Sequence, residues 1–397
     1  NVDGFRFDFT KGFSNTQWGS NSWGSDYDAD RIANLKRMTD EIWKTNEDAY
    51  VILEHLSVNT EEQELADYGM MVWGNINHNY NEATMGFNSG DKSDFSWVSY
   101  KNREFSTPGL VGYMESHDEE RLMFKNLEYG NSSGSYDITE LSTALNRIEL
   151  AANFFIPVPG PKMIWQFGEL GYDISIDQNG RVGKKPVKWE YYEQPDRKAV
   201  YNVYAALNKL KQEEPAFSSG GFSFRNADAA VKELVITHDD MDVYVIGNFG
   251  VEAKTFTPEF SQSGAWYELY SGDSIQTSEI GDIELDPGAY RFYTTKKLEQ
   301  PQFATGLPQT SRASFTEVKV YPNPVGNTAR LQMQMPKGGR ATLKLMNMQG
   351  KVLMNKELHL QSGSNVKTFN TSALANGMYI ITIAGNDIQA RSYLMKR

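Results

Sequence analysis

The sequence predicts an α/β protein in which strands and helices alternate over the first half of the chain and strands alone follow. Over residues 1–215, short apolar runs alternate with segments of helical periodicity, which is the pattern of βαβ units in a parallel sheet. Three of the short runs end in Asp8, Glu54 and Asp118. In a parallel β/α barrel the carboxyl ends of the strands face the active site. From about residue 216 only strand-like runs between turn residues remain, which predicts antiparallel β-domains.

The first expected strand covers residues 4–9 and has two different faces. Side chains alternate between the faces of a strand, so the three phenylalanines fall on one side and Arg6 and Asp8 on the other. An edge strand with a surface Arg–Asp pair would show the same alternation, and this stretch alone leaves both interpretations open. The polar ends of the later strands favour a functional site.

The later elements of this half follow in order. We expect strands at residues 50–53, 69–75, 110–114 and 163–167, and helices at residues 32–42, 60–67, 141–152 and 200–213. Asp137 and Glu140 have the spacing of a capping box before the third helix. His55 has no partner at HxH or HExxH spacing, so we interpret it as a hydrogen-bonded structural residue rather than a metal ligand.

Composition and charge exclude several classes of protein. A chain of 397 residues is long enough for two or three domains. Its net charge of -12, without a clustered basic stripe, argues against a nucleic-acid partner. The absence of cysteine excludes disulfides and thiolate chemistry. No apolar run reaches the roughly eighteen residues of a transmembrane segment.

At its polar strand ends the chain resembles the α-amylase family of retaining glycoside hydrolases (family 13 type). Residues 4–11, Gly-Phe-Arg-Phe-Asp-Phe-Thr-Lys, look like the family's fourth-strand motif, and Glu54 like its fifth-strand acid. Residues 116–118, Ser-His-Asp, resemble the seventh-strand motif, and residues 160–169 the eighth-strand segment. The specificity of the match lies in the ordered set. The resemblance implies a (β/α)8 TIM barrel of which residues 1–215 supply strands 4–8, with the N-terminal part missing.

The resemblance also implies roles for individual residues. Asp8 would be the nucleophile, Glu54 the general acid/base and Asp118 the transition-state stabiliser. Retaining hydrolysis needs this chemistry, because one carboxylate attacks the anomeric carbon while a protonated one donates to the leaving oxygen, at a separation of about 5–5.5 Å. Arg6 would keep Asp8 ionised, whereas Glu54, after an apolar strand, would keep its proton. The substrate-binding residues implied are Arg6, Lys11 and His117.

A structural calcium ion is the one cofactor that the resemblance would allow. Gly12 stands where many members of the family have a histidine near that ion. This difference argues against calcium, and we assign no metal ligands.

The second half of the chain divides into three parts. Residues 216–296 are expected to form an all-β domain C, an antiparallel sandwich in the related enzymes, and residues 297–316 a linker rich in Ser, Thr, Gln and Pro. Residues 317–397 resemble the C-terminal sorting domain of type IX secretion cargo in Bacteroidetes. The resemblance rests on Tyr-Pro-Asn-Pro at 321–324, a Gly-containing hairpin at 347–350 and the Gly-Met-Tyr strand that begins at 377. It implies a small β-sandwich, contact with the type IX secretion machinery, and a secreted or cell-surface location.

The expected function is hydrolysis of α-1,4-glucosidic bonds in starch or glycogen-like α-glucans. The alternatives are an α-glucan transglycosylase such as a branching enzyme, and a noncatalytic surface glucan-binding protein. Hydrolysis ranks first because a secreted protein meets its polymer in bulk water. Because barrel strands 1–3 precede the first motif in the related enzymes, we expect residues 1–397 alone to be poorly soluble and inactive.

Overall fold

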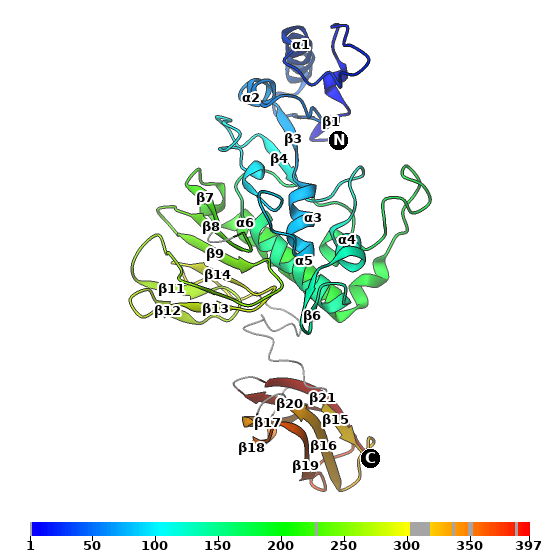
Figure 1. Cartoon of the computed structure of the whole chain (residues 1–397), viewed down its shortest axis with the longest axis vertical. Helices are drawn as coiled ribbons and strands as arrows, with labels where there is room; N and C mark the ends of the chain where they lie inside the picture. The colour runs from blue at the N-terminus through cyan, green and yellow to red at the C-terminus, as the bar shows by residue number, and fades with distance from the viewer. Residues whose placement is uncertain (1, 227–228, 302–317, 336–337, 348–351, 386–387) are drawn as a thin grey trace. The chain divides into compact units, whose positions relative to one another are not determined.

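The structure is a computed structural model that describes residues 2–226, 229–301, 318–335, 338–347, 352–385 and 388–397. The chain forms two compact units, Asn1–Pro308 and Gln309–Arg397. Each unit is described by itself (Figure 1).

A four-stranded parallel sheet organises the start of the first unit. Its order is β1-β2-β3-β4, with β1 at Gly4–Phe7, β2 at Tyr50–Leu53, β3 at Met71–Asn75 and β4 at Leu110–Tyr113. The expected strand at 163–167 is wrong: beside β4 there is a single parallel bridge between Gly112 and Lys162. Residues 163–167 join no sheet, and Phe167, with a left-handed φ of 58°, leads into a 3-10 turn.

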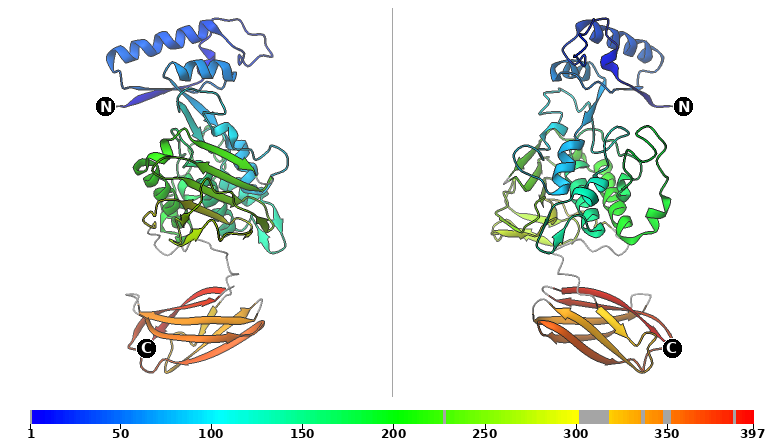
Figure 2. Two further views of the ribbon diagram at one scale, coloured as in Figure 1. Left: turned by 90° about the vertical axis from the view of Figure 1, so that its left-hand side faces the viewer. Right: turned by 45° about the vertical axis from the view of Figure 1, so that its right-hand side comes forward.

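Six α-helices follow or precede these strands in the described part of the first unit. Figure 2 shows α1 and α2, in blue, side by side next to the first strands. Asp28 caps α1, because its Oδ1 accepts hydrogen bonds from the backbone N of Asp30 at 3.0 Å and of Arg31 at 3.1 Å. The helices are α1 (Ala29–Thr45), α2 (Asn59–Asp67), α3 (Asn77–Met85), α4 (Leu122–Tyr129), α5 (Leu141–Phe155) and α6 (Pro195–Glu213).

The predicted capping box before α5 is wrong. Asp137 instead closes its own turn, where its Oδ1 accepts from the backbone N of Thr139 at 2.9 Å and from the Thr139 hydroxyl at 2.7 Å. Glu140 occupies the cap position without a side-chain bond. The short elements here are the hairpin β5 (Ser132–Ser133) and β6 (Tyr136–Asp137), and the 3-10 turns η1 (Thr10–Gly12), η2 (Ser96–Val98), η3 (Gly168–Leu170), η4 (Trp189–Glu193) and η5 (Pro215–Ser218).

The described strands between residues 222 and 294 form a six-stranded sheet and a two-stranded sheet. One face of the larger sheet shares a continuous apolar core with α5, α6 and the parallel sheet, and its other face packs against the smaller sheet. The larger sheet has the order β12-β11-β14-β9-β8-β7, and the smaller pairs β10 with β13. The bounds are β7 (Phe222–Asn226), β8 (Val231–Ile236), β9 (Val243–Asn248), β10 (Lys254–Phe256), β11 (Ala265–Glu268), β12 (Ser274–Gln276), β13 (Ile283–Leu285) and β14 (Tyr290–Thr294).

The contact between β9 and α5 requires a glycine at position 247. A Cβ there would lie 2.5 Å from Leu150 Cδ1 and 2.8 Å from Phe154 Cε2, both in buried side chains. We expect Gly247→Ala to lower the free energy of unfolding by about 1–3 kcal/mol, the usual cost of overpacking. Gly281→Ala is the control, since nothing lies within 4 Å of its added Cβ. Urea unfolding followed by tryptophan fluorescence measures both, and equal stability of the two variants would contradict the prediction.

In its described residues, the second unit has seven strands in two sheets around one apolar core. One sheet has the order β15-β16-β19 and the other β18-β17-β20-β21. The strands are β15 (Val318–Tyr321), β16 (Thr328–Met335), β17 (Gly339–Asn347), β18 (Val352–Leu360), β19 (Gly363–Asn370), β20 (Gly377–Gly385) and β21 (Ile388–Lys396).

Two predicted segments fall largely on residues that the structure does not describe. These are the linker at 297–316, from residue 302 onward, and the hairpin turn at 347–350, from residue 348 onward. None of the described helices combines the length and the apolar character needed to cross a bilayer.

Candidate active site

Three of the predicted site residues converge at the carboxyl ends of the parallel strands. Asp8 follows β1, Glu54 follows β2 and His117 lies in the loop after β4. One potential ligand atom from each of these side chains lies within 4.8 Å of the other two. The parallel sheet brings them together because the ends of its strands lie at one edge.

Arg6 joins the two carboxylates of this group. Its Nη1 lies 2.8 Å from Asp8 Oδ1, and its Nη2 lies 2.7 Å from Glu54 Oε1. The guanidinium also lies 5.0 Å from the ring centre of Trp73 on β3. The guanidinium of Arg6 thus contacts Asp8, the partner that the sequence predicts, and also Glu54 on the neighbouring strand.

Glu54 is the more enclosed of the two acids. Its side chain is 10% exposed, whereas that of Asp8 is 76% exposed. The backbone N of Phe9 donates a hydrogen bond of 3.0 Å to Glu54 Oε2. Phe9 has φ 44° and ψ 50°, a left-handed conformation that is uncommon for a residue with a side chain. This local conformation aims a main-chain donor at the carboxylate.

His117 and Asp118 lie next to each other in the loop after β4. His117 Nε2 is 3.4 Å from Asp118 Oδ2, and the two side chains are 40% and 55% exposed. The His117 ring lies 5.8 Å from that of Trp165, centre to centre. The backbone N of Asp118 donates to Ser116 Oγ at 3.0 Å, which folds the loop back toward β4.

Lys11 lies in the turn η1, directly after the strand that carries Asp8. Its Nζ donates to Ser25 Oγ at 3.2 Å and to the carbonyl oxygen of Leu56 at 3.4 Å, and it lies 5.4 Å from the ring centre of Phe9. The lysine thus links the loops that follow β1 and β2.

A buried ion pair between Arg31 and Glu61 supports the loops that follow β1 and β2. Arg31 Nε lies 2.6 Å from Glu61 Oε1, and both side chains are fully buried. His55 Nε2 lies 2.8 Å from the same carboxylate, which confirms His55 as a hydrogen-bonded structural residue. Burial alone would raise the pKa of Glu61, but the hydrogen bonds from His55 and Arg31 outweigh it and hold that pKa below its usual range.

Glu115, two residues after β4, has a buried carboxyl group. Burial raises its pKa from 4.5 to about 7, although the backbone N of Leu122 donates to its Oε1 at 2.7 Å. Between these pH values the folded protein binds a proton that the unfolded chain has released. Stability therefore falls as the pH rises through this window, and the loss stays constant above it.

We expect Glu115→Gln to remove this pH dependence. The amide keeps an oxygen acceptor for Leu122 but carries no buried charge. At pH 8 the variant should exceed the wild type in free energy of unfolding by about 3 kcal/mol, and at pH 5 by about 1 kcal/mol or less. Urea unfolding at both pH values measures the difference, and a difference that does not change with pH would contradict the prediction.

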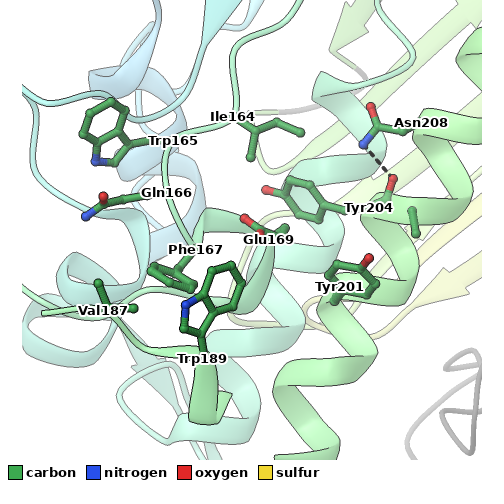
Figure 3. A pocket seen from close by; sticks show the side chains of 11 residues that line it. Ile164, Trp165, Gln166, Phe167, Glu169, Val187, Trp189, Tyr201, Tyr204 and Asn208 are labelled. Carbon is green, nitrogen blue, oxygen red and sulfur yellow. Dashed lines mark hydrogen bonds between the residues drawn. The ribbon is translucent and has the colours of Figure 1, made fainter. Parts of the chain in front are cut away.

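A cavity of about 630 Å³ lies beside Trp165, away from the two central acids. Figure 3 shows aromatic side chains and the Glu169 carboxylate around it. Its lining residues include Trp165, Phe167, Glu169, Trp189, Tyr204 and Asn208. Of these, Trp165 connects the cavity to the site through its contact with His117.

The described residues do not fit a metal ion at the site. Within the described ranges, Asp8, Glu54 and His117 are the one group of histidine and carboxylate side chains close enough to share an ion. Arg6 already places a guanidinium against both carboxylates. A cation would have to displace that positive charge.

Sequence reasoning missed the groups that hold the site. The sequence places Trp165 only in the strand expected at 163–167 and Glu61 only in the helix expected at 60–67. Nothing in the local sequence marks the left-handed backbone of Phe9. A possible signal was the run of polar residues at 59–64, because an acid in the first turn of a helix directly after a strand end can reach back toward it.

Comparison with protein families identifies the second unit. Residues 319–396 match the family described as the secretion system C-terminal sorting domain. The protein is therefore secreted or carried on the cell surface. Among curated protein sequences none matches this chain at a significant level.

Solved structures with a similar fold include α-amylases and a CGTase. An α-amylase from Geobacillus thermoleovorans, solved with acarbose, is 14% identical with a TM-score of 0.53, over 69% of this chain and 60% of that one. An α-amylase from H. orenii is 17% identical with a TM-score of 0.51, over 74% and 61%. A gamma-CGTase from alkalophilic Bacillus clarkii is 13% identical with a TM-score of 0.50, over 91% and 51%. The chain thus shares the α-amylase fold and spans about 60% of the length of these amylases.

Proposed function

We propose that this protein hydrolyses α-1,4-glucosidic bonds of starch or glycogen-like α-glucans with retention of anomeric configuration. The observation that carries the proposal is the convergence of Asp8, Glu54 and His117 at one edge of the parallel sheet, with Arg6 against both acids. The similarity in fold to α-amylases supports the substrate class.

The short distance between the acids favours retention. An inverting enzyme places a water molecule between carboxyl groups about 6.5–9.5 Å apart. Here the nearest ligand atoms of Asp8 and Glu54 lie within 4.8 Å. Asp8, the exposed carboxylate, attacks the anomeric carbon and forms a glycosyl ester as the bond to the leaving oxygen breaks.

Glu54 serves both halves of the reaction. In its protonated form it donates to the leaving oxygen, and in its ionised form it takes a proton from the water that hydrolyses the ester. Arg6 and the Phe9 N–H face the two Glu54 oxygens and stabilise the ionised form. Asp118 stabilises the cationic transition state, while His117 and Lys11 donate hydrogen bonds to sugar hydroxyls.

Transglycosylation is the second candidate, because one of the enzymes with a similar fold is a CGTase. It uses the same covalent intermediate, which a sugar hydroxyl then resolves in place of water. Hydrolysis is favoured because the sorting domain directs the protein to a location where water is in excess.

One assay separates the candidates. The protein is incubated with starch, glycogen and pullulan, and reducing ends are measured together with iodine staining and product chain length. A hydrolase raises reducing ends as staining falls, whereas a transglycosylase changes chain length without new reducing ends. Binding without either change would leave a noncatalytic glucan-binding protein and reject the proposal.

A further inference from the structure

We propose that Thr10 is a positioning residue for Glu54, held in place by a buried chain of polar side chains through His55 to Glu61 and Arg31. The expected effect on catalysis rests on the proposed function, whereas the contacts among these residues do not depend on it.

Thr10 donates two hydrogen bonds to the main-chain carbonyl of Glu54. The carbonyl oxygen of Glu54 accepts from the backbone N of Thr10 at 2.9 Å and from the Thr10 hydroxyl at 3.1 Å. The preceding residue, Phe9, donates its N–H to the Glu54 carboxylate. Thr10 is fully buried, so water does not replace its hydroxyl. The turn after β1 therefore fixes both the backbone and the carboxylate of the acid.

The Thr10 hydroxyl is shared between Glu54 and His55. Its oxygen lies 2.9 Å from His55 Nδ1, and His55 Nε2 lies 2.8 Å from Glu61 Oε1. An ionised Glu61 only accepts, so Nε2 donates to it. The Thr10 hydroxyl therefore lies within hydrogen-bond distance of both the Glu54 carbonyl oxygen and the His55 ring, and His55 links it to the Glu61 carboxylate.

Glu61, at the other end of this series of buried polar side chains, forms an ion pair with Arg31. Arg31 Nη2 donates to Glu61 Oε2 at 2.7 Å, in addition to the contact from its Nε. Arg31 Nη1 donates to the carbonyl oxygen of Lys11 at 2.9 Å, in the same turn as Thr10. One buried pair thus supports this turn directly and through His55. Supporting shells of this kind keep a catalytic group in its productive geometry.

The kinetic test compares two substitutions at Thr10. Thr10→Val keeps the shape and removes the hydroxyl, and we expect kcat on starch to fall about tenfold, as for loss of one hydrogen bond, with KM unchanged. Thr10→Ser restores the hydroxyl and most of the rate. The matched control is Thr39→Val, which removes another fully buried hydroxyl, one that contacts Met70 Sδ at 3.2 Å, and should keep the wild-type rate. A normal kcat in Thr10→Val, or no recovery in Thr10→Ser, would overturn the proposal.

A second measurement does not depend on activity. The amide proton of Phe9, observed by NMR, reports the hydrogen bond to Glu54. In Thr10→Val this resonance should move upfield and its exchange with solvent should quicken about tenfold, while Thr39→Val leaves it unchanged. If the wild type releases no sugar, the proposed function fails, and an unshifted Phe9 amide in Thr10→Val would separately reject the positioning role.

Discussion

Asp8→Asn is expected to lower α-glucan hydrolysis by on the order of 10⁶-fold, the size of effect seen when a covalent nucleophile is removed. A neutral amide does not form the glycosyl ester. The Asp8 side chain is 76% exposed, so the substitution should leave the thermal midpoint unchanged. Reducing-sugar release and thermal unfolding measure the two effects.

Asp3→Asn provides the matched control for this substitution. Asp3 is exposed and precedes the same strand, so the chemical change is identical but lies away from the strand's carboxyl end. Its activity should equal that of the wild type. Wild-type turnover in Asp8→Asn would reject Asp8 as the nucleophile, and proton NMR of the first-released anomer tests retention independently.

Arg31→Met is expected to lower the free energy of unfolding of the first unit by about 3–5 kcal/mol, because it leaves a buried carboxylate without its charged partner. Glu61 is fully buried and would keep only His55 and the backbone N of Asp28 as donors among its observed partners. The carbonyl oxygens of Gly24 and Asp26 also lose a donor. Methionine fills much of the volume, so the loss reports charge and hydrogen bonds more than packing.

Urea unfolding followed by tryptophan fluorescence measures this loss in the intact chain. All 8 tryptophans precede residue 309, so the signal comes from the first unit alone. Arg37→Met, on the exposed face of the same helix, is the control and should change stability by less than about 0.5 kcal/mol. A loss in Arg31→Met no larger than in Arg37→Met would show that the buried pair contributes nothing.

The periodicity of the sequence predicted the elements that carry the candidate site. The alternation in residues 4–9 placed Arg6 and Asp8 on one face, and the two side chains are in contact. The strand itself is shorter than expected, because β1 covers Gly4–Phe7 and Phe9 has a left-handed backbone. The expected end of the last helix before Pro215 is also confirmed, because α6 stops at Glu213. These features depend on residues close together in the chain, so the local sequence contains the information. The catalytic roles themselves stay predictions.

Local patterns failed where two structures compete for the same residues. The apolar run at 163–167 is compatible with a strand, but only the bridge at Lys162 forms before Phe167 turns away. Asp137 could have capped α5, yet its carboxylate bonds to Thr139 within a tighter turn. In both segments, the structure that forms depends on contacts with residues that are present only in the folded protein.

The residue types at the ends of the parallel strands, and the sorting domain at residues 317–397, could be predicted from the sequence. How the site residues are held follows from the tertiary structure. Arg6 meets Glu54 across 48 positions of sequence, and the Thr10 hydroxyl reaches His55 across 45. The physical reason is that strand and helix periods follow from neighbouring residues, whereas burial and ionic partners follow from contacts that exist only after the strands have paired.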